Sequence, residues 1–401
     1  MTRVTVGRSE PTSHGRATDS APVSQGPWAT RELGFGVVHH SSPTGWSVPE
    51  LVEPGLRRNP KRAHLLVSTV LGKHIPTPPD LVLAAGNQLG DLVLAAAGPG
   101  ELVVLGFAET ATGLGHCVAA RIGAGCYLHS TRRQVPGIAV HAGFEEGHSH
   151  ATSHLLLPTA AELFVNDAPL VLVDDEISTG ATALDAIRAL HRHHRRDRYV
   201  VASLVDMRSE AHRAAVDAAA AELGARIEFV SLATGAAVLP AGLIDDVAAL
   251  PDPALNPAYP VPGAFTRVDL SWPATVPDGG RHGFLRSDTA AFDAAITDAT
   301  EQLLAAVPTR RPVIVVGHEE LMYLPLRIAE ALADRGFPVR YQTTTRSPAY
   351  VLDRPGYPLR RGFTFPAPEY DEETPRFLYN ADWRELDVAP LVVVVADAPA
   401  D

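Results

Sequence analysis

The sequence predicts an α/β fold, in which a parallel sheet flanked by helices is followed by a second, smaller α/β domain. From Leu102 onward, short apolar runs alternate with helical patterns, and strands separated by helices form parallel sheets through crossover connections. The same alternation restarts near Arg311, beyond a proline-rich segment. A length of 401 residues is also sufficient for two hydrophobic cores.

The expected elements follow from apolar runs of strand length and from helical periodicity. In the first domain we expect strands at 102–107, 127–128, 170–173 and 200–205, with helices beginning near 112 and 182. In the second domain we expect strands at 313–316, 339–342 and 391–395, and a helix over 324–335.

Composition sets the domain boundaries. Residues 1–25 are rich in Ser, Thr, Gly and Pro and poor in large apolar residues, which predicts a disordered tail. The first α/β domain is expected over 26–250. The proline-rich segment 251–280 is expected to be a linker, because proline lacks the N–H that ladders and helices need. The second domain is then 281–401.

Charge and cysteine content narrow the class of partner. The formal net charge of −12 argues against nucleic acid and anionic membrane as partners, because both are bound by basic patches. Small molecules are the expected ligands. Cys117 and Cys126 lie in apolar surroundings and are expected to be buried thiols of a reducing compartment. No apolar run approaches the roughly 20 residues of a membrane span, so a cytoplasmic location is expected.

The strongest motif follows the strand that ends at Val173. Asp174 and Asp175 come first and can accept hydrogen bonds from vicinal ribose hydroxyls at the carboxyl edge of the sheet. A small, hydroxyl-rich loop then opens a helix, and its N–H groups can bind a phosphate with help from the helix dipole. The loop consists of Ser178, Thr179, Gly180, Ala181 and Thr182. Capping of an ordinary helix would need only one of these residues.

A second turn of small residues follows the strand at 102–105 and also opens a helix. Its backbone N–H groups can bind an anion, although a plain strand-to-helix connection is the alternative. The turn consists of Gly106, Phe107, Ala108, Glu109, Thr110, Ala111 and Thr112.

The segment Asp174 to Thr182 closely resembles the phosphoribosyl-diphosphate motif of type I phosphoribosyltransferases. Together with 59–64, 73–76 and 106–111, it resembles the orotate-phosphoribosyltransferase-like branch that is associated with tellurite-resistance gene clusters, over about residues 30–250. In the second domain, 317–320 and the Thr-Arg-Ser-Pro stretch within 343–348 resemble the TRSP domain that follows this branch.

The resemblance implies a phosphoribosyltransferase-type, Rossmann-like sheet and a set of roles. Asp174 and Asp175 would hold the ribose hydroxyls and would also take part, indirectly, in the binding of Mg²⁺. Residues 178–182 would bind the 5′-phosphate, and residues 106–112 would bind the pyrophosphate. Glu109 is out of place beside a polyanion unless it meets Mg²⁺ or a base. The cations expected to neutralise pyrophosphate are Lys73, Arg132 and Arg133.

Two further groups of polar residues lie outside these loops. His148, His150 and His154 could bind a metal, act in acid–base chemistry or contact pyrophosphate, or simply be solvated, and the sequence leaves these alternatives open. In the second domain, two strand ends carry polar residues that predict a second active or binding site, with helix capping as the alternative. These residues are His318, Glu319, Glu320, Thr345, Arg346 and Ser347.

The functional hypothesis is a phosphoribosyltransferase that uses phosphoribosyl diphosphate and Mg²⁺ to transfer ribose 5-phosphate to or from a nitrogenous base. The resemblance implies that the product is a nucleoside-like metabolite linked to stress or tellurite resistance. A regulatory protein that senses nucleotides or phosphoribosyl diphosphate without turnover is the alternative, because fold does not settle function. A homodimer is left open.

Overall fold

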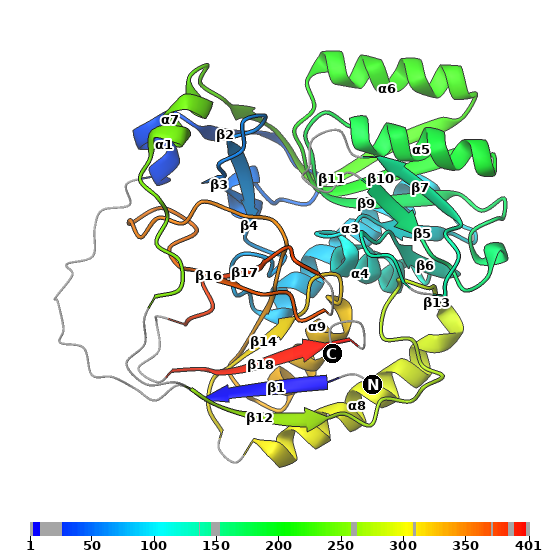
Figure 1. The fold of residues 1–401 in the computed structure, drawn as a ribbon. Helices are drawn as coiled ribbons and strands as arrows, with labels where there is room; N and C mark the ends of the chain where they lie inside the picture. Colours follow the sequence, from blue (N-terminus) through cyan, green and yellow to red (C-terminus); the bar gives the residue numbers. More distant parts are fainter. Residues whose placement is uncertain are drawn as a thin grey trace.

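A computed structural model describes residues 3–8, 26–135, 137–145, 153–257, 263–307, 310–369, 372–383 and 389–397. It contains two mixed sheets with a layer of helices between them (Figure 1). The predicted α/β class with a second, smaller α/β region is confirmed.

The first sheet has seven strands in the order β13-β6-β5-β9-β10-β11-β2. The central strands β6, β5, β9, β10 and β11 run parallel, and the edge strands β13 and β2 are antiparallel to their neighbours. The bounds are β13 (Phe284–Leu285), β6 (Cys126–His129), β5 (Val103–Gly106), β9 (Leu170–Ile177), β10 (Arg198–Asp206), β11 (Arg226–Val238) and β2 (Gly36–Ser41). The expected strands at 102–107, 127–128, 170–173 and 200–205 correspond to β5, β6, β9 and β10, and β5 is one residue shorter than expected at each end.

Strand β9 is apolar because both of its faces are covered. Leu170 and Leu172 pack with α5 (Ala181–His193), whereas Val171 and Val173 belong to the core that contains α3 (Pro79–Ala97) and α4 (Thr112–Ile122). This alternation is the two-residue period of a strand. Helix α6 (Glu210–Leu223) packs beside α5.

The second sheet has the order β12-β1-β18-β14-β15. Its strands are β12 (Ala264–Asp269), β1 (Arg3–Arg8), β18 (Leu391–Ala396), β14 (Val313–Gly317) and β15 (Val339–Thr343). Helices α8 (Thr289–Ala306) and α9 (Tyr323–Asp334) belong to this part of the chain. The strands and the helix expected here from the sequence are confirmed.

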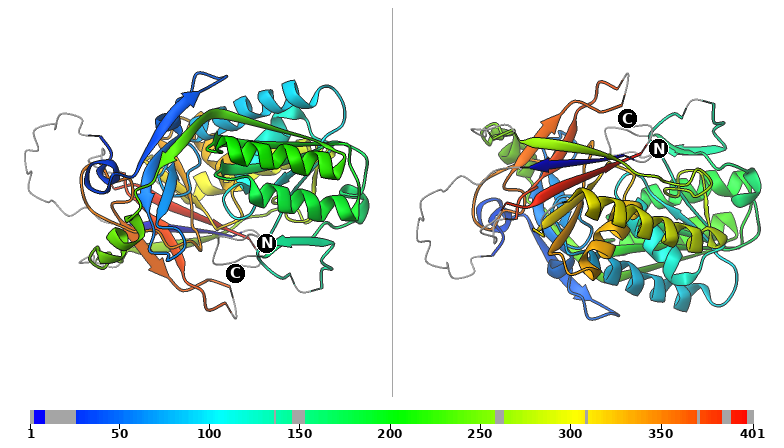
Figure 2. Two further views of the ribbon diagram at one scale, coloured as in Figure 1. Left: turned by 90° about the horizontal axis from the view of Figure 1, so that it is seen from above. Right: turned by 90° about the horizontal axis from the view of Figure 1, so that it is seen from below.

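Two expectations about the flanking segments are corrected by this sheet. Residues 3–8 lie in the segment expected to be a disordered tail, but they form β1, which pairs antiparallel with both β12 and β18 (Figure 2). Residues 264–269 lie in the expected linker and form β12. The reason is that backbone pairing along β18 supplies the partners that short, β-branched stretches such as Val4-Thr5-Val6 cannot find locally.

The remaining elements are short and surround the two sheets. They are α1 (Trp28–Leu33), α2 (Val48–Leu51), β3 (Val52–Leu56), β4 (His64–Ser68), β7 (Ala142–Glu145), β8 (Ser153–Leu156), η1 (Ala161–Leu163), α7 (Leu243–Ala249), η2 (Arg286–Asp288), β16 (Gly362–Phe365) and β17 (Arg376–Tyr379). Strands β3 and β4 form an antiparallel hairpin. This hairpin contributes to the functional pocket described below.

One apolar core runs through both domains. Helices α3 and α4 contact α9, and Leu89, Leu114 and Leu324 belong to a single buried cluster. Contrary to the expectation that no segment could span a membrane, α3 is long and apolar enough to do so by length and composition. A core helix meets the same criteria, and the residues of α3 that face α4 and the sheet, among them Val82, Leu89 and Val93, are buried. We therefore interpret α3 as a core helix.

The edge of β15 also pairs with the first domain. Thr77 and Tyr341 exchange two backbone hydrogen bonds of 2.9 and 2.7 Å, and the Thr343 N–H donates to the Gly72 carbonyl at 2.9 Å. Gly72 has φ +72°, and a Cβ on it would lie 2.6 Å from the Tyr341 ring. Only glycine allows this close approach, which holds the loop that carries Lys73.

We expect Gly72→Ala to lower the free energy of unfolding by about 3 kcal/mol, the sum of the left-handed φ and the clash. Gly123→Ala is the matched control, because Gly123 has φ +60° and a Cβ added there would have nothing within 4 Å. It should cost only about 1 kcal/mol. Urea denaturation of both variants measures the difference, and equal losses would contradict the contact with Tyr341.

Candidate functional site

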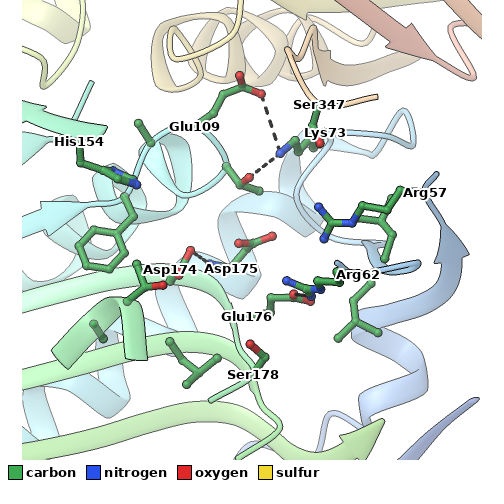
Figure 3. Close-up of a pocket in the computed structure, with 18 of the residues that line it drawn as sticks. Arg57, Arg62, Lys73, Glu109, His154, Asp174, Asp175, Glu176, Ser178 and Ser347 are labelled. Carbon is green, nitrogen blue, oxygen red and sulfur yellow. Dashed lines mark hydrogen bonds and ion pairs between the residues drawn. The ribbon is translucent and has the colours of Figure 1, made fainter. Parts of the chain in front are cut away.

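A cavity of about 210 Å³ lies at the carboxyl ends of β5 and β9 and is lined by residues from both domains. The carboxyl edge of a parallel sheet is the usual ligand site of open α/β folds. Figure 3 shows Asp174 and Asp175 near its centre, with Arg57 and Arg62 on one side and Glu109 and Lys73 on another.

The loop between β9 and α5 forms one wall, and all five residues predicted to bind phosphate, 178–182, line the cavity. Gly180 precedes the helix with φ +83°, a left-handed value that favours glycine. The Thr179 hydroxyl accepts a hydrogen bond of 3.2 Å from the Ala181 N–H. The amino end of α5 therefore faces the cavity, where unsatisfied N–H groups and the helix dipole favour an anion.

Three consecutive carboxylates, Asp174, Asp175 and Glu176, line the cavity next to this loop. The Asp175 N–H donates to the Asp174 carboxylate at 2.9 Å, and Glu176 forms an ion pair with Arg62. Burial, and then the charge of Glu176, raises the pKa of Asp175, while Lys73 acts in the opposite direction. A ligand that brings hydroxyl donors or a cation would relieve this repulsion.

The second predicted anion-binding turn is divided between the cavity and the core. Phe107, Ala108, Glu109 and Thr110 line the cavity. Gly106, Ala111 and Thr112 do not, and the Thr112 hydroxyl donates instead to the Glu320 carbonyl at 2.9 Å.

His154 lines the cavity and also supports this turn. Its Nδ1 lies 2.8 Å from the Ser130 hydroxyl oxygen, which accepts a hydrogen bond of 2.9 Å from the Ala108 N–H. The imidazole is 1% exposed and stacks on Phe144 at 4.5 Å. This buried position argues against the solvated-loop alternative for His154, whereas His148 and His150 lie outside the described residues.

Two of the three predicted cations reach the cavity. The Lys73 ammonium donates to the Thr110 hydroxyl at 2.5 Å and lies 3.9 Å from Glu109 (Figure 3). Arg132 also lines the cavity. Arg133 does not, which corrects its predicted role as a cation for pyrophosphate.

Arg133 points instead into the boundary between the domains. It is 8% exposed and pairs with Glu319 at 2.7 Å, with Asp397 at 3.8 Å and with Glu369. Three carboxylates, two of them buried, compensate the charge of this guanidinium away from the cavity. We call the buried residues His318, Glu319, Glu320, Asp397, Arg133, Arg281 and Arg376, together with the partly buried Glu369, the seam cluster.

The prediction of a separate second-domain site is also corrected. His318, Glu319 and Thr345 line neither this cavity nor two others among the described residues, and of these three cavities Glu320 lines only a void of about 10 Å³, too small for a substrate. Glu320 accepts hydrogen bonds from the Thr131 hydroxyl at 2.7 Å and the Arg132 N–H at 2.9 Å. These motif residues build the boundary between the domains, because their charges find arginine partners there.

A metal centre is not favoured in this cluster. His318, Glu319 and Glu369 lie close enough together to hold an ion. However, Arg133 and Arg376 each pair with both carboxylates. Their positive charges already occupy the place of a cation.

The Thr-Arg-Ser-Pro stretch joins the first cavity. The Thr345 hydroxyl donates to one Glu109 carboxylate oxygen at 2.5 Å, and the Arg346 N–H donates to the other at 3.2 Å. Arg346, Ser347 and Pro348 line the cavity. From the sequence, a carboxylate at position 109 was unexpected beside a polyanion. In the structure, Glu109 binds Thr345 and Arg346 of the second domain.

The hairpin side of the cavity carries residues to which the sequence analysis gave no role. These residues are Arg57, Arg62, Leu65, Leu66 and His74. His74 is 4% exposed, and its Nε2 has no hydrogen-bond partner within the described ranges. Burial, together with Lys73 and Arg57, lowers the pKa of His74 well below its ordinary value, so the ring is neutral at pH 7. The basic run from Arg57 to Arg62 in an acidic chain was the available signal.

Charge in the seam cluster strongly perturbs Glu320. Burial alone would raise its pKa, but Arg281, His129 and Arg133 outweigh burial and lower the pKa to about 2. The pKa of Glu369 is also lowered to about 2, because a hydrogen bond from His318 and the charge of Arg133 outweigh burial. Both groups are therefore ionised at neutral pH.

Family models match two parts of the chain. Residues 51–236 match a model described as phosphoribosyl transferase, and residues 278–401 match one described as the TRSP domain C-terminal to that transferase. A comparison with curated proteins gives no match.

Among solved structures, the adenine phosphoribosyltransferase of Trypanosoma brucei, in complex with AMP, pyrophosphate and ribose-5-phosphate, is 15% identical and covers 47% of this chain and 77% of its own, with a TM-score of 0.34. The enzyme of Rhodothermus marinus is 17% identical and covers 45% and 94%, with a TM-score of 0.32. The enzyme of Giardia lamblia, in complex with 9-deazaadenine, is 17% identical and covers 45% and 93%, with a TM-score of 0.31.

We expect the stability contributed by Glu320 to depend on pH. Its folded pKa lies below its unfolded value, so this contribution is complete above about pH 4.5 and is lost as the pH falls toward 2. Glu320→Gln should lower the free energy of unfolding by about 3 kcal/mol at pH 7 and by much less at pH 3. Urea denaturation at both pH values measures this, with the exposed Glu301→Gln as control. A pH-independent difference would contradict the assignment.

Proposed function

We propose that this chain, which belongs to the phosphoribosyl transferase family and carries a TRSP domain after it, transfers ribose 5-phosphate from phosphoribosyl diphosphate to a nitrogenous base in the cavity between its two domains. The observation that carries the proposal is the convergence of three groups on one cavity. The loop 178–182, the pair Asp174–Asp175 and the turn 107–110 all line it.

The three groups match the three parts of phosphoribosyl diphosphate. The N–H groups at the start of α5 suit the 5′-phosphate. Asp174 and Asp175 suit the ribose 2′ and 3′ hydroxyls, which are hydrogen-bond donors to carboxylates. Lys73 and Arg132, with the turn 107–110, suit the pyrophosphate, which carries the largest negative charge of the substrate.

The reaction is a displacement at C1′ of the ribose. A ring nitrogen of the base forms a bond to C1′ with its lone pair, the bond from C1′ to the pyrophosphate oxygen breaks, and pyrophosphate leaves with that electron pair while the base loses a proton. The configuration at C1′ inverts. This chain's residues contribute by positioning and by stabilising charge, because Asp174 and Asp175 fix the ring and Lys73 stabilises the departing oxygens.

The hairpin side is the proposed place of the base. Leu65 and Leu66 offer an apolar surface to a flat ring, and the buried Nε2 of His74 offers a polar atom for the ring edge. Arg57 and Arg62 add positive charge on this side. A polar nitrogen heterocycle satisfies all of these groups.

The carboxylates fit the Mg²⁺ that this reaction class implies. Asp174 and Asp175 present hard oxygen ligands, and the second carboxylate oxygen of Glu176 is buried without a hydrogen-bond partner within the described ranges. A bound Mg²⁺ would neutralise charge between these carboxylates and pyrophosphate. The contribution of Asp174 and Asp175 to holding the ion would be indirect, since their proposed role is to hold the ribose.

The wider biological role completes the proposal. The product is a nucleoside-like metabolite linked to stress or tellurite resistance, and the enzyme works in the cytoplasm on small molecules, without nucleic acid or membrane as partners. A homodimer is compatible with this reaction.

The first test is isothermal titration with phosphoribosyl diphosphate and Mg²⁺. The wild type should bind saturably, and the double variant Asp174→Asn, Asp175→Asn should bind at least about tenfold more weakly, because amides accept hydrogen bonds from hydroxyls less strongly than carboxylates do. Pyrophosphate release with a panel of bases then measures turnover. Absence of binding at millimolar ligand would refute the proposal, whereas binding without turnover for any base would favour a sensor.

A further inference from the structure

We propose that Arg346 of the TRSP domain binds the pyrophosphate group of phosphoribosyl diphosphate, so that the second domain supplies part of the substrate site instead of a site of its own. This inference rests on the proposed function of the cavity. It assigns a binding role to Arg346 and a positioning role to Thr345.

The Thr-Arg-Ser-Pro stretch lies at the wall of the cavity. Arg346 and Ser347, which follow β15, line the cavity. Figure 3 shows Ser347 on the same side of the cavity as Glu109 and Lys73. Thr345 is fixed there by two backbone hydrogen bonds with Phe377, of 2.9 and 2.8 Å. The side chain of Arg346 therefore starts from a rigid backbone next to the turn 107–110.

Glu109 binds the Thr-Arg-Ser-Pro stretch. Its two carboxylate oxygens accept from the Thr345 hydroxyl and the Arg346 N–H, and its charge lies 3.9 Å from Lys73. A carboxylate on an anion-binding turn would repel pyrophosphate. Here it is 7% exposed and satisfied by the second domain. Glu109 thus serves to fix the Thr345–Arg346 backbone at the pyrophosphate end of the cavity.

The Arg346 guanidinium is held by two carboxylates. Its Nε donates to Glu319 at 3.0 Å, and its Nη1 lies 3.4 Å from Glu372. These carboxylates hold the planar group from the side of the seam cluster. An arginine has five N–H donors, so two such contacts leave donors for phosphate oxygens. A guanidinium held in this way binds phosphate without losing further side-chain freedom.

Both acidic and basic side chains line the cavity. Asp174, Asp175 and Glu176 place three carboxylates beside the substrate, and Arg62 pairs with Glu176. Lys73 lies next to Glu109. Arg346 is the arginine that the second domain adds to the cavity wall, beside Lys73 and Arg132 of the first domain.

The test compares two ligands that divide the substrate between them. Inorganic pyrophosphate with Mg²⁺ reports on the pyrophosphate end, and ribose 5-phosphate reports on the loop 178–182 and the aspartates. Arg346→Met should weaken pyrophosphate binding by about 10- to 100-fold, the usual effect of a lost charged contact, and change ribose 5-phosphate binding by less than about threefold. Isothermal titration of the full chain measures both.

Two further variants make the result specific. Arg346→Lys keeps the charge but loses the planar fork, so pyrophosphate affinity should fall between those of the wild type and Arg346→Met. Arg360→Met makes the same change at an exposed arginine of the same domain that pairs with Asp353, and should leave both affinities unchanged. Normal binding of ribose 5-phosphate shows that each variant is folded.

The outcomes separate this inference from the proposed function. If the wild type binds neither ligand, the proposed function fails. If the wild type binds both ligands but Arg346→Met and Arg346→Lys weaken neither or weaken both equally, Arg346 is only part of the seam cluster and the inference is overturned.

Discussion

A fully buried carboxylate ties the two domains together. Glu319 is 0% exposed, and arginines from both domains surround it: Arg133 comes from the first, while Arg346 and Arg376 come from the second. Removing one partner from such a buried group typically costs several kcal/mol, because a charge is left without compensation. Separation of the domains would break the ion pairs of Glu319 and leave charged groups without partners. The two domains therefore behave as one unit around the cavity.

The same boundary shapes the substrate site. Glu320 holds the Arg132 backbone, the Thr345–Arg346 backbone holds Glu109, and the edge of β15 holds the loop before Lys73. Each contact fixes either a residue that lines the cavity or the residue next to it in the sequence. The loop 178–182 and the aspartates depend instead on β9 and α5 of the first domain. The cavity thus has one end built within the first domain and another end completed by the second.

The sequence could predict what local patterns specify. Strand β9, its two aspartates and the loop opening α5 are contiguous, so apolar runs and turn residues were sufficient. Arg132 and Arg133 are adjacent in sequence, but Arg132 lines the cavity whereas Arg133 pairs with Glu319 at the boundary between the domains. Only residues far away in the chain determine which of the two arginines reaches the cavity. The acidic residues of 318–320 had the composition of an active site, but their arginine partners come from elsewhere. Strands β1 and β12 were missed because their stability comes from each other and from β18.

The order of the second sheet has a consequence for how the chain acquires its structure. Arg3 pairs with Ala396, so β1 lies beside β18, although almost the whole length of the described chain separates them. The entropy of closing so large a loop grows only slowly with its length, but contacts this distant in sequence form late. The parallel strands β5, β9, β10 and β11 are synthesised well before β18. During synthesis, the acidic residues of 318–320 can meet Arg133 before the sheet that carries them has gained its final strands. The second domain therefore completes its folding on a surface that the first has already prepared.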